Sequence, residues 1–193
     1  VPILPINLGN FGFITEIAKD EWQEAFEKYL DGTLRIAERM MIRVKVYREG
    51  ICVHNQTALN DMVIGSAGIS KIVNLSVCLS TLPIVRYRAD GVIVSTPTGS
   101  TAYSAAAGGP ILHPEMEAMI LIPTTEYIAI TVDAKQRTDI ILTTDGQVVV
   151  PLKPLDRITI EAADVRVRLV QTNKRSFYTV LKEKLNWAGG PDA

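Results

Sequence analysis

Residues 90–110 read DGVIVSTPTGSTAYSAAAGGP, and this stretch defines its local fold more sharply than any other part of the chain. The β-branched run 92–94 predicts a strand, a hydroxyl-rich turn follows it, and alanines then favour a short helix. Gly108-Gly109-Pro110 predicts the end of that helix. A strand, a polar turn and a helix N-terminus in this order present backbone N–H groups to a phosphorylated or sugar-bearing ligand.

The side chains of this turn fit two interpretations. Four residues carry hydroxyls that both donate and accept hydrogen bonds, namely Thr98, Ser100, Thr101 and Ser104. Gly99 would let a ligand approach the backbone closely. The alternative is an ordinary strand-to-helix turn whose hydroxyls cap their own helix. Because Gly99-Ser100-Thr101 does not supply the Gly-x-Ser-x-Gly pattern of a nucleophile elbow, a serine hydrolase using His113 is not favoured.

Composition narrows the possible function classes. The chain has 193 residues, of which 47% are hydrophobic, so it can build a full core and at most two domains. A net charge of −1 gives no electrostatic basis for nucleic-acid binding. No apolar run approaches the roughly 20 residues that span a membrane. Cys52 and Cys78 lack metal-ligand spacing and are expected to be buried free thiols in a reducing cytoplasm.

The hydrophobic pattern predicts mostly strands. Ile42, Val44 and Val46 alternate with polar residues, which is typical of a half-buried strand. Further strands are expected at 58–64, 73–79, 83–87, 91–95, 118–122, 127–132, 139–144, 147–152, 157–161 and 165–170. Asp145-Gly146 between two of them is a strong hairpin signal. Many short strands of this spacing favour an all-β sandwich as the larger part of the molecule.

Two helices are expected at the ends of the chain. Near the start, Asp20 resembles an N-cap with Gln23 as its capping-box partner, and Gly32 ends the helix. Trp22 and Phe26 fall on one face of this helix and are expected in the core. The last helix is predicted from the apolar spacing of Phe177, Val180, Leu181, Leu185 and Trp187.

A second polar group interrupts the apolar run at 58–64. Asn60 brings an amide that donates and accepts, and the Asp61 carboxylate can accept from both hydroxyls of a ribose. The alternative is a solvent-facing bulge. Asp90 could likewise accept from an amide of a ligand, or it could form a simple turn with Gly91.

Together these motifs resemble the NAD kinases, enzymes that phosphorylate the 2′-hydroxyl of the adenosine ribose of NAD. Residues 90–114 are similar to the signature of that family, and four further segments fit in the family's order: 10–15, 59–63, 145–147 and 181–187. The resemblance covers nearly the whole chain. It implies an enzyme that takes NAD as substrate and ATP or polyphosphate, with Mg²⁺ or another divalent metal, as phosphoryl donor.

The resemblance also implies a fold of α/β plus all-β type. Residues 1–35 would be the tail of an N-terminal Rossmann-like α/β domain, and residues 36–170 a larger β-sandwich domain that binds NAD. Residues 171–193 would form a C-terminal segment whose helix returns to the first domain. The family forms homodimers or homotetramers, so the same is expected here, in the cytoplasm, with no nucleic-acid or membrane partner.

The family's site residues are carried over position by position. Asn60 and Asp61 would bind the ribose of the adenosine half. The turn would contact adenine, ribose and the nicotinamide half through Thr98, Thr101, Ala102, Tyr103 and Ser104, with Ala106 close by. Asp90 would reach the nicotinamide end, partly across a subunit boundary, and Arg88 would lie near it. Three more positions match pocket residues of the family: Phe13 on the adenine side, Lys71, and Gln147 in the late hairpin.

The chain departs from the family pattern at two places. The family's Gly-Gly-Asp-Gly motif lies upstream of the Asn7 loop, and its aspartate is the expected general base, so no catalytic residue and no metal ligand is predicted within residues 1–193. Pro123 also runs directly into Thr124, where a longer segment is expected. We therefore expect these residues to belong to a longer enzyme. The alternatives are a non-catalytic dinucleotide-binding module and, less favoured, a lipid or sphingoid kinase, a group without the Thr-Gly-Ser-Thr-Ala-Tyr run.

Overall fold

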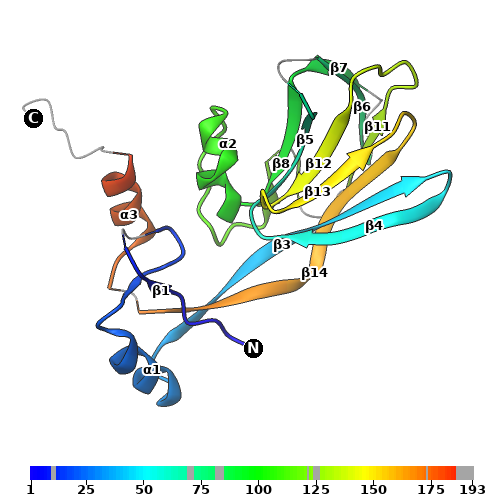
Figure 1. Cartoon of the computed structure of the whole chain (residues 1–193). Helices are drawn as coiled ribbons and strands as arrows, with labels where there is room; N and C mark the ends of the chain where they lie inside the picture. Colours follow the sequence, from blue (N-terminus) through cyan, green and yellow to red (C-terminus); the bar gives the residue numbers. More distant parts are fainter. Residues whose placement is uncertain are drawn as a thin grey trace, which may run out of the picture. The chain divides into compact units, whose positions relative to one another are not determined.

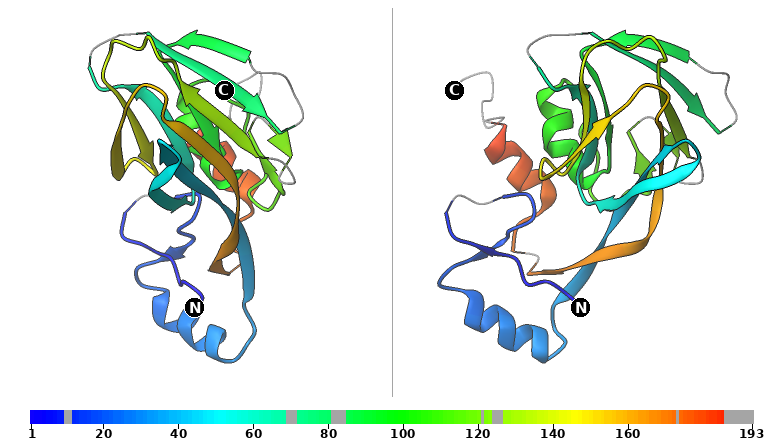
Figure 2. Two further views of the ribbon diagram at one scale, coloured as in Figure 1. Left: turned by 90° about the vertical axis from the view of Figure 1, so that its right-hand side faces the viewer. Right: turned by 45° about the vertical axis from the view of Figure 1, so that its right-hand side comes forward.

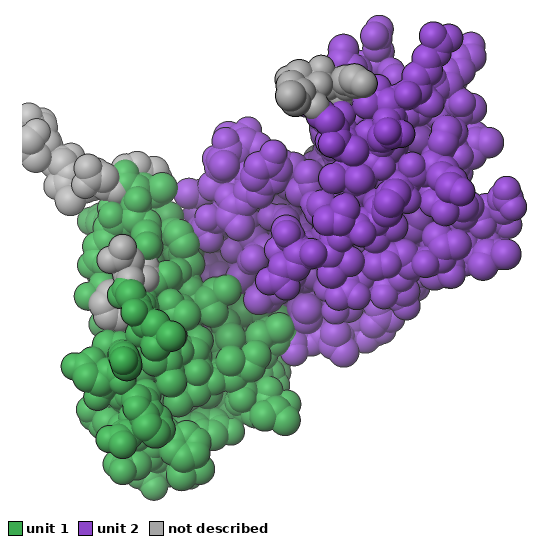
Figure 3. Space-filling view, viewed as in Figure 1, with its two compact units in different colours: residues 1–39, 167–193 green, residues 40–166 purple. Residues whose placement is uncertain are grey.

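The computed structural model of the protein describes residues 1–9, 12–68, 72–80, 85–120, 122–123, 127–172 and 174–185. The chain divides into two compact units, coloured separately in Figure 3. Unit 1 contains residues 1–39 and 167–193, and unit 2 contains residues 40–166. No helix in the described segments has the length and apolar character needed to cross a membrane.

Strands dominate the described elements, which Figure 1 labels along the chain. In chain order they are β1 (Ile6–Asn7), β2 (Ile17–Ala18), α1 (Trp22–Leu30), β3 (Arg35–Arg48), β4 (Ile51–Ala58), β5 (Asp61–Ser66), β6 (Val73–Leu79), β7 (Val85–Ala89), β8 (Gly91–Ser95), the 3-10 helix η1 (Thr98–Thr101), α2 (Tyr103–Ala106), β9 (Ala118–Met119), β10 (Ile122–Pro123), β11 (Ile128–Val132), β12 (Ile140–Thr144), β13 (Val148–Leu152), β14 (Arg157–Gln171) and α3 (Phe177–Lys184).

The two larger sheets form a β-sandwich (Figure 1, Figure 2). One has the strand order β4-β3-β14-β11-β6-β7 and the other the order β13-β12-β5-β8. Side chains from both sheets belong to one hydrophobic cluster, which includes Ile42 on β3, Ile64 on β5 and Ile130 on β11, all fully buried. The predicted β-sandwich is therefore confirmed, and its core separates the two sheets as expected from the period-two pattern.

Most strand predictions are confirmed with shifts at the ends. The predicted strand 91–95 coincides with β8, and Asp145-Gly146 turns β12 into β13 with both residues at positive φ, 50° and 66°. The predicted strands 157–161 and 165–170 are in fact one strand, β14. Its middle residues 162–164 contain no glycine or proline that would break it.

Unit 1 holds the two ends of the chain. β1 and β2 pair in parallel, with Ile6 opposite Ile17. Ile3 bridges Leu169, so the start of the chain is hydrogen-bonded to the end of β14. A parallel pair beside helices is compatible with an α/β domain. The larger Rossmann-like domain remains a prediction.

The first helix differs from its prediction at the start and on its face. It begins at Trp22, with Glu21 rather than Asp20 as N-cap and no side-chain capping bond. The Glu21 carboxylate instead accepts from the Lys174 ammonium at 2.8 Å. The prediction that Trp22 and Phe26 lie in the hydrophobic core is wrong in the described structure, because these side chains are 43% and 44% exposed.

The other helix ends follow their local signals. Gly32 lies at φ +68°, directly after the Asp31 C-cap of α1, as the glycine predicted. α3 begins with Ser176 as N-cap, whose side chain accepts from the backbone N–H of Thr179. The predicted terminal helix is thus confirmed, while Trp187 lies outside the described residues.

Candidate functional site

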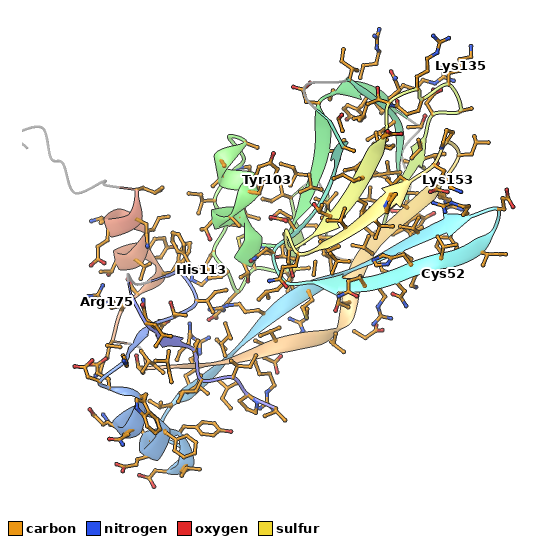
Figure 4. The ribbon with its side chains drawn as sticks, viewed as in Figure 1. Cys52, Tyr103, His113, Lys135, Lys153 and Arg175 are labelled. Carbon is orange, nitrogen blue, oxygen red and sulfur yellow. The ribbon has the colours of Figure 1, made fainter. Side chains whose placement is uncertain are left out.

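The outer face of the four-stranded sheet carries two neighbouring pockets. Because side chains alternate along a strand, the buried Ile64 of β5 points into the sandwich and Val63 points outward. One pocket has a volume of about 510 Å³ and the other about 420 Å³. Val63, Tyr103 and Thr143 line both pockets, so the two are contiguous over β5 and β12 with α2 beside them. Figure 4 labels Tyr103 on α2.

The turn after β8 is attached to the connection between β4 and β5. The Thr96 hydroxyl donates to the carbonyl of Leu59 at 2.5 Å, and the Thr96 N–H donates to the carbonyl of Asn60 at 2.9 Å. The Ser95 hydroxyl also donates to the Asn60 carbonyl, at 3.2 Å. These bonds place the turn and the predicted Asn60-Asp61 pair beside each other, although 35 residues separate them in the chain.

Gly99 packs against the backbone of Asn60, which differs from its expected role of admitting a ligand. A Cβ atom at this position would lie 2.0 Å from the carbonyl oxygen of Asn60 and 2.6 Å from its Cα. The close approach that requires glycine is therefore to the chain itself and not to a ligand. The expectation that Gly99 opens the backbone to a ligand is wrong, and the residue instead allows the turn to pack against Asn60.

The hydroxyls of the turn are largely used within the fold. Ser100 is fully buried, donates to the carbonyl of Pro97 at 2.6 Å and accepts from the N–H of Leu112 at 3.0 Å. The Thr101 hydroxyl donates to the carbonyl of Thr98 at 3.2 Å. These hydroxyls are therefore used by the fold, but not as the predicted helix caps, because neither η1 nor α2 has a side-chain hydrogen bond at its N-cap. Ser100, buried and bonded in this way, is not available as a nucleophile.

Thr98 carries a buried hydroxyl that none of the described residues binds. Its residue is 6% exposed, and among the described residues its Oγ1 has no hydrogen-bond partner. A buried hydroxyl without a partner is unfavourable by about 1–3 kcal/mol. Thr98 is therefore the member of the turn that gains most from a polar partner supplied from outside the chain.

Asn60 and Asp61 lie on the wall of the 420 Å³ pocket, and Asp145 joins them. The Asp145 carboxylate accepts three backbone N–H groups: Leu59 at 2.8 Å, Asn60 at 2.7 Å and Asp61 at 3.2 Å. Sequence reasoning missed Asp145 because a hairpin turn explains an Asp-Gly pair completely. No local pattern indicates that its carboxylate binds residues more than 80 positions away.

Asp61 is an unusual carboxylate. It is only 5% exposed, and burial raises its pKa above the ordinary range, with the nearby negative charge of Asp145 adding to the effect. The backbone N–H of Tyr103 donates to it and partly offsets the rise in pKa. Perturbed carboxylates of this kind in a pocket are typical of functional sites.

The 510 Å³ pocket is lined mainly by small and apolar groups. Gly65 and Gly91 are paired across β5 and β8 and form part of its lining, together with Ile93 and Ile141. Asp90, the residue before β8, is the one acidic residue among the described residues that line this pocket. Tyr103, which is 56% exposed, lines both this pocket and the neighbouring one around Asp61.

The predicted site residues are thus only partly brought together. Asn60, Asp61, Asp90, Ala102 and Tyr103 line the pockets. Thr98, Thr101, Ser104 and Ala106 belong to the same η1–α2 segment without lining either pocket, and Gln147 is an exposed residue of the adjoining turn. Arg88 is exposed on β7 of the other sheet. Phe13 belongs to unit 1, where its ring lies 6.0 Å from that of Phe177, and Lys71 lies outside the described residues.

The site offers few ligands for a metal ion. Within the described segments no group of three or more His, Cys, Asp or Glu side chains is arranged to hold one. Asp61 and Asp145 form only a pair, and the Asp145 oxygens already accept three N–H groups. These residues do not fit a resident metal centre.

The family model that matches this chain is that of an NAD kinase domain, and three of its relatives are NAD kinases. The family model "ATP-NAD kinase C-terminal domain" matches residues 59–172. The NAD kinase of Geotalea daltonii is 38% identical over 97% of this chain and 70% of its own length. That of Geobacter sulfurreducens is 39% identical with the same two coverages, 97% and 70%. That of Treponema denticola is 37% identical over 98% of this chain and 72% of its own length.

Two solved structures share the fold. Yeast NADH kinase complexed with NADH aligns with a TM-score of 0.86 at 22% identity, covering 98% of this chain and 61% of that one. An NAD kinase from Archaeoglobus fulgidus in complex with ATP aligns with a TM-score of 0.75 at 25% identity, covering 97% and 75%. The matched segment 59–172 contains the Asn60-Asp61 pair, the turn after β8 and Asp145, and the chain belongs to the NAD kinase family.

Proposed function

We propose that this protein transfers a phosphoryl group from ATP, or from another donor such as polyphosphate, to the 2′-hydroxyl of the adenosine ribose of NAD, giving NADP. One observation carries the proposal beyond family membership. Asn60 and the buried Asp61 lie at one end of two contiguous pockets, and Asp90 lies at the other. That arrangement suits a long ligand with a sugar at one end and a second polar group at the other.

The reaction requires positioning more than covalent chemistry from the protein. The bond between the terminal phosphorus and the bridging oxygen of the donor breaks, and a bond to the 2′ oxygen forms. The proton of that hydroxyl passes to a base. Asn60 and Asp61 would hold the ribose by donating from the amide and accepting at the carboxylate, so that the 2′-hydroxyl faces the donor.

The remaining contacts are proposed along the two pockets. Thr98, Thr101, Ala102, Tyr103 and Ser104, with Ala106 nearby, would contact adenine, ribose and the nicotinamide half. Asp90 and Arg88 would serve the nicotinamide end, and Phe13 the adenine side. Gln147 would contribute from the late hairpin, and Lys71 would be one further contact. The position of Tyr103 on the lining of both pockets supports its contact with both halves of the ligand.

The general base is expected in a Gly-Gly-Asp-Gly segment upstream of Asn7, outside residues 1–193. Mg²⁺ would neutralise the donor phosphates when it is bound with ATP. Because the described residues do not fit a resident metal site, the metal would be held by the donor phosphates and not by side chains of these residues.

The wider organisation of the protein belongs to the same proposal. Residues 1–35 would complete an N-terminal Rossmann-like α/β domain on which residues 171–193 pack, and residues 36–170 would form the NAD-binding domain. Homodimers or homotetramers are proposed, supported by the exposed side chains of the edge strand β7, such as Val85 and Tyr87. A cytoplasmic location is proposed as well, supported by the free thiol of Cys52, which is exposed rather than buried as expected.

A coupled assay for NADP on the full-length protein, with ATP and polyphosphate compared, tests this function. Asp61→Ala is expected to lower kcat/KM for NAD at least about 100-fold, because the ribose loses its main acceptor. The matched control is Asp164→Ala, which removes a carboxylate that is 87% exposed on β14. It is expected to retain full activity.

Two outcomes would contradict the proposal. Unchanged kinetics in Asp61→Ala would remove that residue from the site. Tight NAD binding without NADP formation by the full-length wild type, with either donor, would instead support a non-catalytic dinucleotide-binding module.

A further inference from the structure

We propose that Asp145, resting on the function proposed above, is a positioning residue that holds Asn60 and Asp61 in the geometry in which they bind the ribose. The Asp145 carboxylate, in the β12–β13 hairpin, accepts hydrogen bonds from the backbone of the β4–β5 connection. It thereby fixes the two side chains without contacting the reacting atoms itself.

The hydrogen bonds run in both directions. Three consecutive N–H groups, of Leu59, Asn60 and Asp61, donate to the Asp145 carboxylate at 2.8, 2.7 and 3.2 Å. In return the N–H of Asp145 donates to the carbonyl of Asp61 at 3.0 Å. Hydrogen bonds to an ionised acceptor are roughly twice as strong as neutral ones. This segment is therefore held more firmly than an ordinary strand connection.

The turn itself does not require a carboxylate. The N–H of Gln147 donates to the carbonyl of Thr144 at 3.0 Å, and Asp145 and Gly146 lie at φ +50° and +66°. Asn and Gly adopt such angles as readily as Asp does. The three bonds to residues 59–61 are what a carboxylate adds to this hairpin, and they all lead to the proposed ribose-binding pair.

The placement has a direct consequence for binding. Asn60, Asp61 and Asp145 line the same 420 Å³ pocket, and the opposite side of the Asn60 backbone is fixed by Thr96 and Gly99 of the turn. Functional groups must be held within about 0.5 Å of the productive position. A displacement of about 1 Å can lower the rate about 100-fold. Losing the hydrogen bonds from Asp145 to residues 59–61 is expected to lower the rate by a factor of that size.

Two variants separate the carboxylate from the turn. Asp145→Asn keeps the positive φ and one acceptor oxygen, and Asp145→Gly keeps the positive φ and no acceptor. We expect kcat/KM for NAD to fall about 10-fold in the first and about 100-fold in the second. KM for ATP is expected to stay within about twofold, because the donor is not bound by residues 59–61.

Asp156→Asn is the control for simple loss of stability. The Asp156 carboxylate is buried and accepts from the N–H of Lys153 at 2.8 Å and from Arg48 at 2.7 and 2.9 Å. Asp156 lies on the turn between β13 and β14 and lines neither pocket of the proposed site. The Asp156→Asn variant should have a lower free energy of unfolding and an unchanged kcat/KM for NAD. If the Asp145 variants behave like Asp156→Asn, losing stability alone, the positioning role is overturned.

Hydrogen exchange gives a readout that does not depend on turnover. In Asp145→Gly the amides of Leu59, Asn60 and Asp61 should exchange at least about 10-fold faster, while those of Met62–Ile64 keep their protection. Unchanged protection at 59–61 would overturn the inference even in an active enzyme. An inactive wild type with the predicted exchange pattern would overturn the proposed function and leave the grip of Asp145 demonstrated.

Discussion

Asp61 brings a carboxylate to a place that is poorly suited to a negative charge. It is 5% exposed, burial raises its pKa, and the charge of Asp145 raises it further. A group that is unfavourable in its ionised form and persists in a pocket is typical of a residue retained for function at the expense of stability.

Replacing Asp61 with Asn should therefore stabilise the protein at neutral pH. Between the ordinary value of 3.8 and the raised pKa, the folded state binds more protons than the unfolded state, so stability falls as pH rises through this window. Each unit of difference in pKa corresponds to about 1.4 kcal/mol. Asn removes this penalty and can still accept from the Tyr103 N–H through its amide oxygen.

Urea unfolding of wild type and Asp61→Asn over about pH 4 to 8 measures the effect. The advantage of Asn should be largest at the upper end and shrink as the pH approaches 3.8. Asp164→Asn, at an 87% exposed position, should leave the curve unchanged. A variant less stable than wild type at every pH would show that Asp61 stabilises the fold.

At the scale of single residues, the sequence indicates which side chains can bind a ligand. It does not indicate which distant residues those side chains contact. Asn60, Asp61 and Tyr103 are predicted site residues, and the structure places them on one pocket. Gly99 is assigned to a ligand and faces the Asn60 backbone instead, since a close approach between segments nearly 40 residues apart leaves no local pattern.

At the scale of elements, the pairing of β5 with β8 creates room for a ligand. Gly65 and Gly91 face each other in the register of these strands, and both line the 510 Å³ pocket. A Cβ atom at Gly65 would meet only the carbonyl oxygen of Asp90, at an ordinary 3.8 Å. Side chains can therefore be added there without disturbing the sheet.

Gly65→Ala and Gly65→Val should fill this pocket step by step. We expect KM for NAD to rise a few-fold with Ala and at least about 10-fold with Val, while kcat changes little, because both variants remove space that the ground state and the transition state use equally. The free energy of unfolding should stay within about 1 kcal/mol, since β-branched residues suit strands. Steady-state kinetics with urea denaturation checks both; an unchanged KM in Gly65→Val would place the ligand outside this pocket.

Elements are predictable wherever the signal is local. The Asp145-Gly146 hairpin, the strand 91–95 and the last helix follow from their own residues and are confirmed. The start of α1 is not, because Glu21 binds Lys174 from the other end of the chain rather than capping its own helix. Tertiary contacts of this kind override capping preferences that each amount to about 1 kcal/mol.

At the scale of the whole molecule, the sandwich class is predictable from alternation, while the site depends on which strands become neighbours. β5 lies between β8 and β12, so the Asn60-Asp61 pair, the turn after β8 and the β12–β13 hairpin converge. The sequence order of these three segments carries no sign of that adjacency. Asp145 was missed for this reason.

The contiguity of the two pockets predicts that NAD stabilises the protein more than either of its halves does. When one half of a dinucleotide is bound in the first pocket, binding of the other half in the second pocket becomes intramolecular, which raises the affinity of the whole ligand. At about 100 times its Kd, NAD should add about 2.7 kcal/mol to the free energy of unfolding. That corresponds to a rise in Tm of roughly 5–10 °C for a chain of this size.

Thermal denaturation of the full-length protein with NAD, AMP or nicotinamide mononucleotide at equal concentration measures the difference. Asp61→Ala should lose most of the shift with NAD, because the ribose end of the ligand is no longer held, whereas Asp164→Ala should keep all of it. An equal shift from AMP and NAD would mean that the 510 Å³ pocket contributes nothing to binding. In that case the glycine pair of β5 and β8 would need an explanation other than space for the second half of the dinucleotide.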